Sequence, residues 1–424
     1  MSKHNSFLFL MAMMVTGAVQ ADDYHYVNML VGDRAAGMAG AYTAVADDTA
    51  GLFYNPAGIV YAPGSSLSGS MNAYQQNSTN YKQVLGGQYD WKRSSGTLLP
   101  NFFGIVQPLG NGMVGFSYAV PNSIEEDQDQ IFPNIATTLG TADRFIINFN
   151  NSDNTYQFGP SYAYPINDRL SVGATLYFHY RQQQRISNTI LAYTSASPVD
   201  RVWSNEYYQL EEKGVKPVLG VTWSPMNQLA LGASVSRVEL FDSNITMHQA
   251  CLGANSSVYS AGSLCQSGNI LNHQVITSTI KGDYPLNINL GGAWFASDAL
   301  LVSADIKYFG SSGSGADTRV SVTNFALGTE YYLNPRWAMR GGLYTDFANT
   351  PNLQSNFTAY NQPEHVDLYG LAFSFSHFTR NSSLSFGFNY TTGSGKAQVV
   401  SGSTSLQDVS VEGLGIFMAA SYSY

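Results

Sequence analysis

The stretch LSVGATLYFHY, residues 170–180, alternates apolar side chains with small or polar ones along its whole length. Successive side chains of a β-strand point to opposite faces, so one face of this stretch is apolar and the other is more polar. The apolar face carries Leu170, Val172, Ala174, Leu176, Phe178 and Tyr180, and the other carries Ser171, Gly173, Thr175, Tyr177 and His179. The pattern predicts a strand that separates lipid from water.

The same alternation recurs from residue 63 to the end of the chain. We expect about fourteen strands, an even number, as single-chain bacterial membrane barrels have. The last strand ends the chain on an aromatic residue, Tyr424, which resembles the terminal strand of outer-membrane barrels. The strands begin near residues 65, 98, 113, 156, 170, 206, 229, 275, 300, 322, 336, 366, 383 and 411.

Short and long connections alternate between these strands. Six are tight turns, such as LGNG at 109–112, and seven are longer polar segments. Outer-membrane barrels have short periplasmic turns and long outer loops. Residues 63–424 therefore predict an all-β fold, an antiparallel transmembrane β-barrel with both termini in the periplasm. The long segments, which we expect to be loops, are roughly 77–97, 122–155, 182–205, 241–274, 310–321, 347–365 and 392–410.

Strand parity places four charged side chains in the lumen: Asp305, Lys307, Glu330 and Arg340. A charge facing lipid at mid-membrane would cost about 2–4 kcal/mol, so the inward orientation also follows from energy. Lys307, Glu330 and Arg340 fall on three consecutive strands and predict a ladder of ion pairs. We interpret this ladder as structural rather than ligand-binding.

The composition agrees with a membrane barrel. Charged residues make up only 12% of the 424 residues, while 28 Tyr and 23 Phe are in excess. The mean hydropathy of -0.11 excludes a bundle of membrane helices. Apolar and polar strand faces cancel in such an average. The net charge of -9 argues against nucleic acid as a partner.

The first 21 residues have the features of a signal peptide. Lys3 supplies a positive start, residues 7–19 an apolar core, and residues 19–21 a cleavage site with small residues. A membrane anchor is the alternative, but the apolar core is too short to span a bilayer. We expect the mature chain to begin at Asp22.

Export makes disulfides possible, and the chain has two cysteines, Cys251 and Cys265. They lie close together in a polar stretch, and we expect them to be bridged. The alternative is a metal site with His248, but two thiolates and one imidazole do not complete a closed zinc set.

Residues 22–62 precede the first strand and differ from the rest of the chain. The segment GDRAAGMAGAYTAVADDTAGLFYNPAGI, residues 32–59, is rich in Gly and Ala and shows little alternation. Small residues permit close packing, and Asn55-Pro56 predicts a turn. A barrel of this width would otherwise hold an aqueous channel. We therefore interpret residues 22–62 as a plug, or hatch, folded inside the lumen.

Six positions of this segment carry a family resemblance: Ala46, Asp47 and Asp48, then Asn55, Pro56 and Ala57. They resemble the N-terminal hatch of the outer-membrane long-chain fatty acid transporter family (FadL/TodX type). The resemblance implies a hatch-closed barrel of fourteen strands. It also implies that hydrophobic molecules pass from an outer groove, through a lumenal pocket, to a gap in the wall that opens into the membrane. Long-chain fatty acids, aromatic hydrocarbons and other lipids all remain open as substrates.

Two neighbouring strands suggest where such a gap lies. The third strand points small side chains inward, as does the fourth, and proline in the fourth removes a backbone N–H from the ladder. We expect an interruption of pairing between strands three and four that serves as a lateral exit, although a harmless bulge is the alternative. The residues concerned are Gly115, Ser117, Ala119, Gly159, Pro160, Ser161 and Ala163.

The sequence contains no nucleophile elbow, zinc motif, phosphate-binding loop or dinucleotide fingerprint, so we expect neither an enzyme nor a cofactor. A dyad of His377 with a serine remains open. Three functions are possible: a lateral transporter for hydrophobic solutes, a diffusion porin, and a surface or secretion scaffold. We expect a monomer surrounded by outer-membrane lipids.

Overall fold

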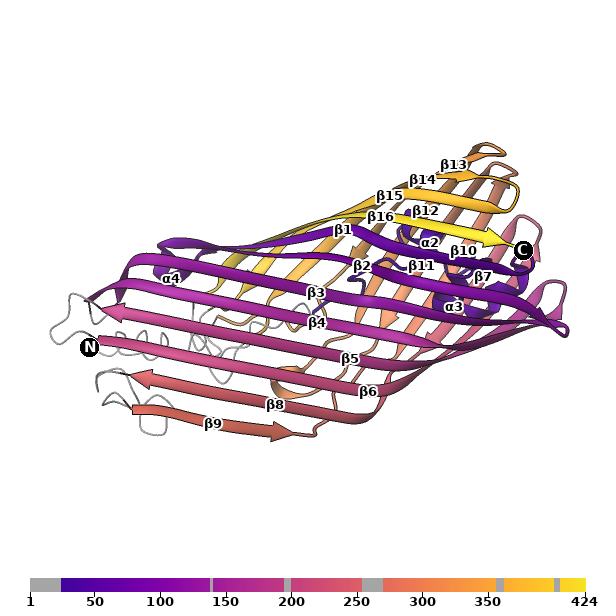
Figure 1. The fold of residues 1–424 in the computed structure, drawn as a ribbon. Coiled ribbons are helices and arrows are strands. Elements are labelled where there is room, and N and C mark those ends of the chain that lie inside the picture. The colour runs from indigo at the N-terminus through magenta and orange to yellow at the C-terminus, as the bar shows by residue number, and fades with distance from the viewer. Residues whose placement is uncertain (1–23, 138–139, 194–199, 254–269, 356–361, 400–404) are drawn as a thin grey trace.

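The structure, a computed structural model, describes residues 24–137, 140–193, 200–253, 270–355, 362–399 and 405–424. It contains one antiparallel sheet of sixteen strands (Figure 1). The strands are β1 (Ser66–Gln83), β2 (Tyr89–Leu109), β3 (Gly112–Thr137), β4 (Gly140–Asn167), β5 (Leu170–Tyr193), β6 (Asp200–Met226), β7 (Leu229–Ser236), β8 (Glu239–Gly253), β9 (Ile270–Ser278), β10 (Asn287–Ser297), β11 (Leu300–Phe309), β12 (Val322–Asn334), β13 (Trp337–Asp346), β14 (His365–Phe378), β15 (Ser382–Ala397) and β16 (Gln407–Ser423).

The sheet closes on itself. β1 pairs with both β2 and β16, and β5 pairs with both β4 and β6. β8 and β9 form an outward hairpin that pairs only with the outer part of β6, so fourteen of the sixteen strands form the ring. The predicted barrel of fourteen antiparallel strands is confirmed.

The wall is much taller on one side than on the other. β3, β4, β5 and β6 have 26, 28, 24 and 27 residues, whereas β10, β11, β12 and β13 have 11, 10, 13 and 10. About 9–11 residues suffice for a strand to cross a bilayer. The long strands therefore project beyond the membrane and form the extended part of the molecule in Figure 1.

The loop assignments at 77–97, 122–155, 182–205 and 241–274 are wrong for most of their length, because the strands continue through them. Part of the inward face there is apolar: Phe132, Phe145, Leu191 and Val202 belong to a buried cluster at the outer end of the barrel. Other inward side chains of these segments, such as Glu126 and Asp153, are buried and charged. The outward side chains, such as Gln182 and Gln184, are polar because this part of the wall faces water. Polar outer faces made these strands look like loops.

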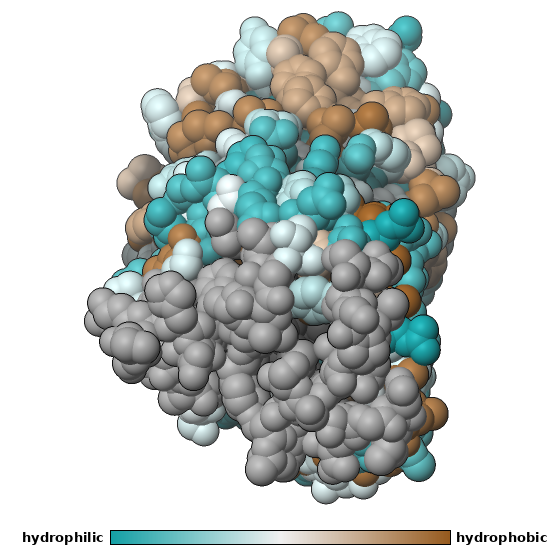
Figure 2. Space-filling model, turned by 90° about the vertical axis from the view of Figure 1, so that its left-hand side faces the viewer, coloured by the Kyte–Doolittle hydropathy of each residue, from teal (hydrophilic) through white to brown (hydrophobic). Residues whose placement is uncertain are grey.

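An apolar band surrounds the shorter part of the wall. Leu176, Leu219 and Phe325 are among its exposed side chains. On β3, β4 and β5 the band ends in a row of stacked rings, Tyr118, Tyr156 and Tyr180, with centroids 6.4 and 6.2 Å apart. Aromatic side chains mark both membrane–water interfaces in such barrels. Hydrophilic residues gather around the projecting end in Figure 2, and hydrophobic ones lie further back.

The hatch fills the lumen. It contains α2 (Asp33–Gly37), α3 (Gly51–Tyr54) and the 3-10 helix η1 (Pro56–Tyr61), and almost all its residues from position 29 to 59 are buried or nearly so. The predicted hatch is confirmed. α4 (Val84–Gly87) and the short η3 (Gly315–Asp317) lie in outer connections. None of the described helices is long and apolar enough to cross a membrane.

The proposed signal peptide, residues 1–21, lies outside the described residues. Cys251 is disulfide-bonded, whereas Cys265 also lies outside them.

Candidate functional site

An ion-pair network fastens the hatch to the wall at α2. Arg34 contacts Glu330 through both Nε and Nη2, at 2.9 and 2.5 Å, and also binds Asp47. Arg340 binds Glu330 at 2.7 Å and approaches Asp33 at 3.8 Å. Burial raises the pKa of the Asp47 carboxyl, although the neighbouring Arg34 guanidinium acts in the opposite direction. Two of the three members of the expected ladder, Glu330 and Arg340, thus pair with each other, and the hatch supplies the second arginine.

Lys307, the third member of that ladder, lies elsewhere, with its Nζ 5.7 Å from the centroid of the Tyr54 ring. Its neighbour Asp305 holds the middle of the hatch. One carboxylate oxygen of Asp305 accepts hydrogen bonds from the backbone N–H groups of Tyr42 and Thr43 and from the Thr43 hydroxyl, at 2.9, 2.9 and 2.7 Å. A carboxylate is a strong acceptor for such donors. These lumenal charges therefore bind the hatch itself.

Asn55 joins the hatch to the opposite wall. Its amide nitrogen donates to the Thr43 carbonyl at 2.8 Å and to the Val221 carbonyl at 3.1 Å, and its oxygen accepts from the Ala57 N–H at 3.2 Å. The next residue, Pro56, begins η1, where its missing N–H removes no helical bond. The Asn-Pro-Ala motif is thus the turn that seats the hatch on β6.

Ala46, Asp47 and Asp48 form the preceding turn. Ala46 has a positive φ of 36°, and the Asp48 carboxylate accepts a hydrogen bond from the Ala50 N–H at 2.8 Å.

The hatch also approaches the wall closely at inward-facing glycines. A methyl group at Gly328 would lie 2.6 Å from the Met38 carbonyl oxygen. Comparable contacts occur at Gly115, Gly173, Gly220, Gly232, Gly291 and Gly342.

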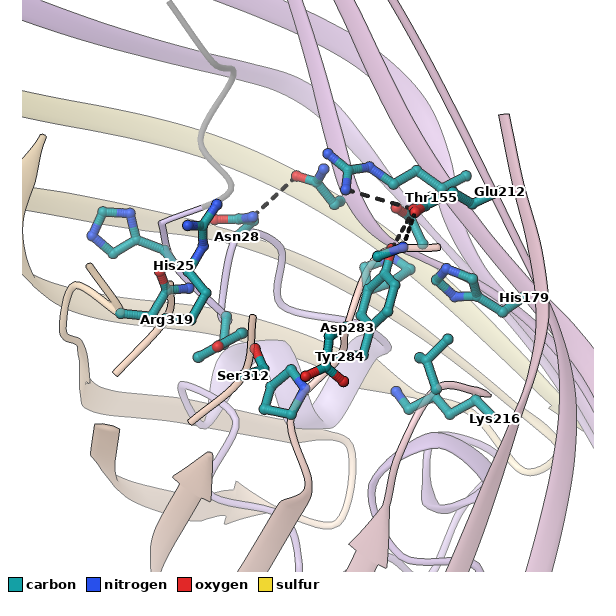
Figure 3. Close-up of a pocket in the computed structure, with 18 of the residues that line it drawn as sticks. His25, Asn28, Thr155, His179, Glu212, Lys216, Asp283, Tyr284, Ser312 and Arg319 are labelled. Atoms are coloured by element: carbon teal, nitrogen blue, oxygen red, sulfur yellow. Dashed lines mark hydrogen bonds and ion pairs between the residues drawn. The ribbon is translucent and has the colours of Figure 1, made fainter. Parts of the chain in front are cut away.

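A lumenal chamber of about 890 Å³ lies between the hatch and the buried apolar cluster at the outer end. This volume lies within the range of small-molecule sites. Apolar side chains such as Met29, Phe53 and Val218 line it, together with basic and acidic side chains (Figure 3). Arg181 pairs with Asp153 at 2.7 Å. Among the described residues, no group of His, Cys, Asp and Glu side chains is placed to hold a metal ion.

Residues 24–30 cross the lumen as a strap at one side of the chamber. The Val27 N–H donates to Asp346 at 3.0 Å, and the Tyr26 ring stacks on Phe309 with centroids 4.2 Å apart. Asn28 donates to the Asn122 side chain on β3 at 3.1 Å, the contact drawn beside the Asn28 label in Figure 3. The strap therefore links the hatch to β3.

The wall has an interruption of pairing between β2 and β3. Ser95 pairs with Glu126 and Phe102 with Ala119, but residues 96–101 and 120–125 are not paired with each other. The interruption begins two positions outside the Phe103–Tyr118 pair, next to the outer aromatic row. We call this feature the window.

Proline and a bulge account for the window. Pro100 lies on the β2 side and Pro121 on the β3 side, and neither has a backbone N–H to donate. The β3–β4 register also shifts between Ala119 and Asn122, which marks a bulge at the edge of the window.

Two further hollows lie beside the window, one inside the barrel and one on its outer surface. One of about 90 Å³ shares residues 27–30 of the strap with the chamber. The other, of about 370 Å³, is lined by residues 94–96 of β2 and 125–127 of β3, and it shares Ser95 and Glu126 with the first. The strap and the Arg93–Glu126 ion pair of 2.7 Å separate these spaces. The three cavities form an interrupted path from the lumen to the side of the barrel.

The expected interruption between strands three and four is wrong in position. β3 and β4 pair across it, with Phe116 opposite Pro160 and Ser117 opposite Gly159. The small inward residues serve the hatch instead: a methyl group at Gly115 would lie 2.5 Å from the Leu52 side chain, and Ala163 packs with Leu52. The other small inward residues are also buried: Ser161 bonds to Thr175 at 2.7 Å, and Ala119 closes the inner end of the window. Pro160 is exposed on the outer face.

The comparisons with known proteins agree with this geometry. Residues 12–314 match the family described as outer membrane protein transport protein (OMPP1/FadL/TodX). A FadL homologue of Pseudomonas aeruginosa is 15% identical with a TM-score of 0.65, over 94% of this chain and 99% of that one. The Pseudomonas putida toluene transporter TodX is 14% identical with a TM-score of 0.62, over 93% and 98%.

The toluene transporter TbuX of Ralstonia pickettii is similar to the same extent, with 15% identity, a TM-score of 0.59 and coverage of 93% and 98%. At these identities the likeness concerns the fold. No curated protein matches the sequence. Because the family match spans well over half of the chain, this protein belongs to the OMPP1/FadL/TodX family of outer membrane transport proteins.

Proposed function

We propose that this protein carries hydrophobic molecules into the outer membrane by a lateral route. A molecule occupies the chamber, passes the strap, and leaves between β2 and β3. The observation that carries this proposal is the series of cavities that ends at the window, while the hatch fills the lumen beneath the chamber. The solved relatives described as toluene transporters support a hydrophobic substrate.

A lateral exit suits the physics of such a substrate. A hydrophobic molecule gains free energy at about 25 cal/mol per Å² of apolar surface removed from water, so leaving through the wall avoids the aqueous periplasm. The window begins at the outer aromatic row, where the wall meets the membrane interface. Unpaired backbone groups are expensive in lipid, and this position lets water reach them.

The experiment is an uptake assay with a tryptophan that fills the path. Ile124 is 8% exposed and lines the small cavity beside the window. Cells that express Ile124→Trp should accumulate radiolabelled dodecanoate at least about tenfold more slowly than wild type, because the indole closes the path, whose narrowest cavity measures about 90 Å³.

The matched control is Ile131→Trp, the same exchange on the same strand. Ile131 is 57% exposed on the outer surface, so uptake should be unchanged. Equal uptake by both variants at equal surface expression would reject the window as the exit.

Single-channel conductance separates this function from a diffusion porin, because a hatch-filled barrel should pass almost no ions. Substrate-dependent uptake separates a transporter from a surface or secretion scaffold.

We infer a monomer without enzymatic activity, with lipids of the outer membrane around its apolar band.

A further inference from the structure

We propose that the tall part of the wall is a hinged flap, which swings away from β2 and admits a hydrophobic molecule at the outer mouth. The inference rests on the proposed function for the kind of molecule that passes, and it adds the movement that lets the molecule in. The flap comprises the outer parts of β3, β4, β5 and β6 together with β8 and β9, that is, residues 122–137, 140–158, 178–193, 200–214, 239–253 and 270–278.

Neither edge of the flap is held by a ladder of backbone hydrogen bonds. On one edge, β3 pairs with β2 at Ser95–Glu126 but at no position further out, although β2 begins at Tyr89 and β3 continues to Thr137. The neighbouring β1–β2 and β3–β4 ladders do continue outward, to Trp91 and Thr137. On the other edge, β9 pairs only with β8 among the described strands, and Figure 1 shows it at the margin of the sheet. The flap is therefore laddered to the rest of the barrel only at its base.

A line of irregularities crosses the sheet at this base. The β3–β4 register shifts after Ala119, and the β6–β8 register shifts after Lys213. On β4, Gly159 and Pro160 are absent from the β4–β5 register. Bulges and prolines bend strands and interrupt their ladders. These positions lie close to the outer aromatic row, so the line marks a hinge where the wall leaves the membrane.

Side chains take the place of the ladder along the β2 edge. Arg93 pairs with Glu126 at 2.7 Å, and the Gln130 amide donates to the Lys92 carbonyl at 2.5 Å. Three buried polar atoms of this seam have no hydrogen-bond partner, namely Arg93 Nε, Thr97 Oγ1 and Gln130 Oε1. Native proteins pair nearly all of their buried polar groups, so opening to water would satisfy atoms that the closed seam leaves unpaired. We call the Arg93–Glu126 pair the latch.

The flap closes against the opposite wall through apolar side chains. Its Phe132, Phe145 and Leu191 belong to the same buried cluster as Trp91 of β2 and Val366 of β14. Such contacts are non-directional, so a hydrophobic molecule can replace one side of them without leaving a polar group unpaired. A hydrophobic constriction opposes ions, which would lose their water. Opening of the flap therefore favours the entry of hydrophobic molecules.

The first test links the flap to β2 in cells that express the full-length protein. Ser94→Cys and Asp127→Cys place two exposed thiols across the seam, one position beyond the Ser95–Glu126 pair. A short bis-methanethiosulfonate linker should slow the accumulation of radiolabelled dodecanoate at least about tenfold relative to the unlinked double variant, because the flap can no longer swing. Each single variant should keep its rate when treated with the same reagent.

The matched control links two strands within the flap. Asp127→Cys with Asn150→Cys joins paired positions of β3 and β4, and both positions line the same outer hollow as Ser94. This link should leave uptake within about twofold, because both strands move together. Unchanged uptake with the β2–β3 link, or an equal loss with the β3–β4 link, would overturn the flap.

The second test measures the movement itself. Spin labels are placed at Gln184→Cys on the flap and at Thr392→Cys of β15, both exposed, on the far side of the ring. Pulsed electron paramagnetic resonance in nanodiscs should resolve a shorter and a longer distance. Glu126→Gln should raise the population of the longer distance at least about threefold, because the latch loses its charge.

Glu125→Gln is the control for this measurement. Glu125 is exposed beside the latch and bonds to Ser152 and Asn154, which also belong to the flap. It should leave the two populations unchanged. A single distance that is the same in wild type and in Glu126→Gln would contradict a latched flap.

The flap and the window fail separately. If Ile124→Trp blocks uptake but the β2–β3 link does not, the window stands as a fixed opening and the flap fails. If the β2–β3 link blocks uptake but Ile124→Trp does not, the flap stands as the entrance and the window fails as the exit.

Discussion

Asn55 shows how a single side chain holds the hatch in place. It is fully buried and bonds to the hatch at Thr43 and Ala57 and to the wall at Val221 and Thr222. A net hydrogen bond contributes about 0.5–1.5 kcal/mol, and a buried partner left unpaired costs more. Asn55 is therefore a point at which the hatch can be loosened selectively.

Asn55→Ala should lower the free energy of local opening of residues 40–60 by about 2–4 kcal/mol. Hydrogen–deuterium exchange of the nanodisc-embedded protein measures this change directly. Asn148→Ala, at an exposed position of β4, is the control and should exchange like wild type. Unchanged protection in Asn55→Ala would contradict the role given to this residue.

At the same scale, the sequence predicted which hatch residues matter but not what they touch. Asn55-Pro56 could be assigned to a turn because asparagine and proline have strong local preferences. The partners of Asp47 and Asp305 depend on how the hatch packs, and no local pattern encodes that. The hydrogen bonds of Gln157 with His179 and Lys216 were missed, because they join side chains of β4, β5 and β6 that lie far apart in the sequence.

Among the elements, the inward glycines of the wall decide how closely the hatch fits. Gly291 and Gly292 are adjacent on β10 and face opposite sides. A methyl group at Gly291 would lie 2.9 Å from the Ala44 nitrogen and 2.6 Å from Asp305 Oδ1, whereas at Gly292 the nearest atom would be 3.8 Å away. An alanine at position 291 would therefore press against the hatch, whereas an alanine at position 292 would not.

Gly291→Ala should destabilise the seated hatch by about 1–3 kcal/mol, as overpacking does, and raise the ion conductance. Thermal unfolding and single-channel recording measure the two effects. Gly292→Ala should match wild type in both. If Gly291→Ala changed neither the thermal stability nor the conductance, the hatch would not be packed closely against β10.

Among the elements, the strands are evident from the sequence within the membrane but not where they project beyond it. Between residues 170 and 180 the side chains that face lipid are apolar and those that face the lumen are smaller or more polar, so the alternation reveals the strand. Beyond Tyr180 the outer face turns polar while Leu191 and Tyr193 still point into a buried cluster. A strand whose outer face meets water has no lipid-facing signal, so its length was underestimated.

For the whole molecule, closure of the barrel followed from strand number and connection lengths, but the position of the window did not. A gap in pairing belongs to two strands at once. The small residues of strands three and four, together with Pro160, pointed to the β3–β4 side of β3, whereas the unpaired positions lie on its β2 side. Pro100 and Pro121 were the available signal. Because β2 and β3 run antiparallel, the two prolines lie at the same level on either side of the gap.

The central claim is that a hydrophobic molecule moves from the chamber to the window and not through the hatch. Photo-crosslinking with a diazirine-labelled dodecanoate in nanodiscs, followed by mass spectrometry, tests it most directly. Labels should fall on chamber residues, on the strap, and on residues 94–96 and 125–127 at the window. Labels along the periplasmic face of the hatch, with none at the window, would contradict the account.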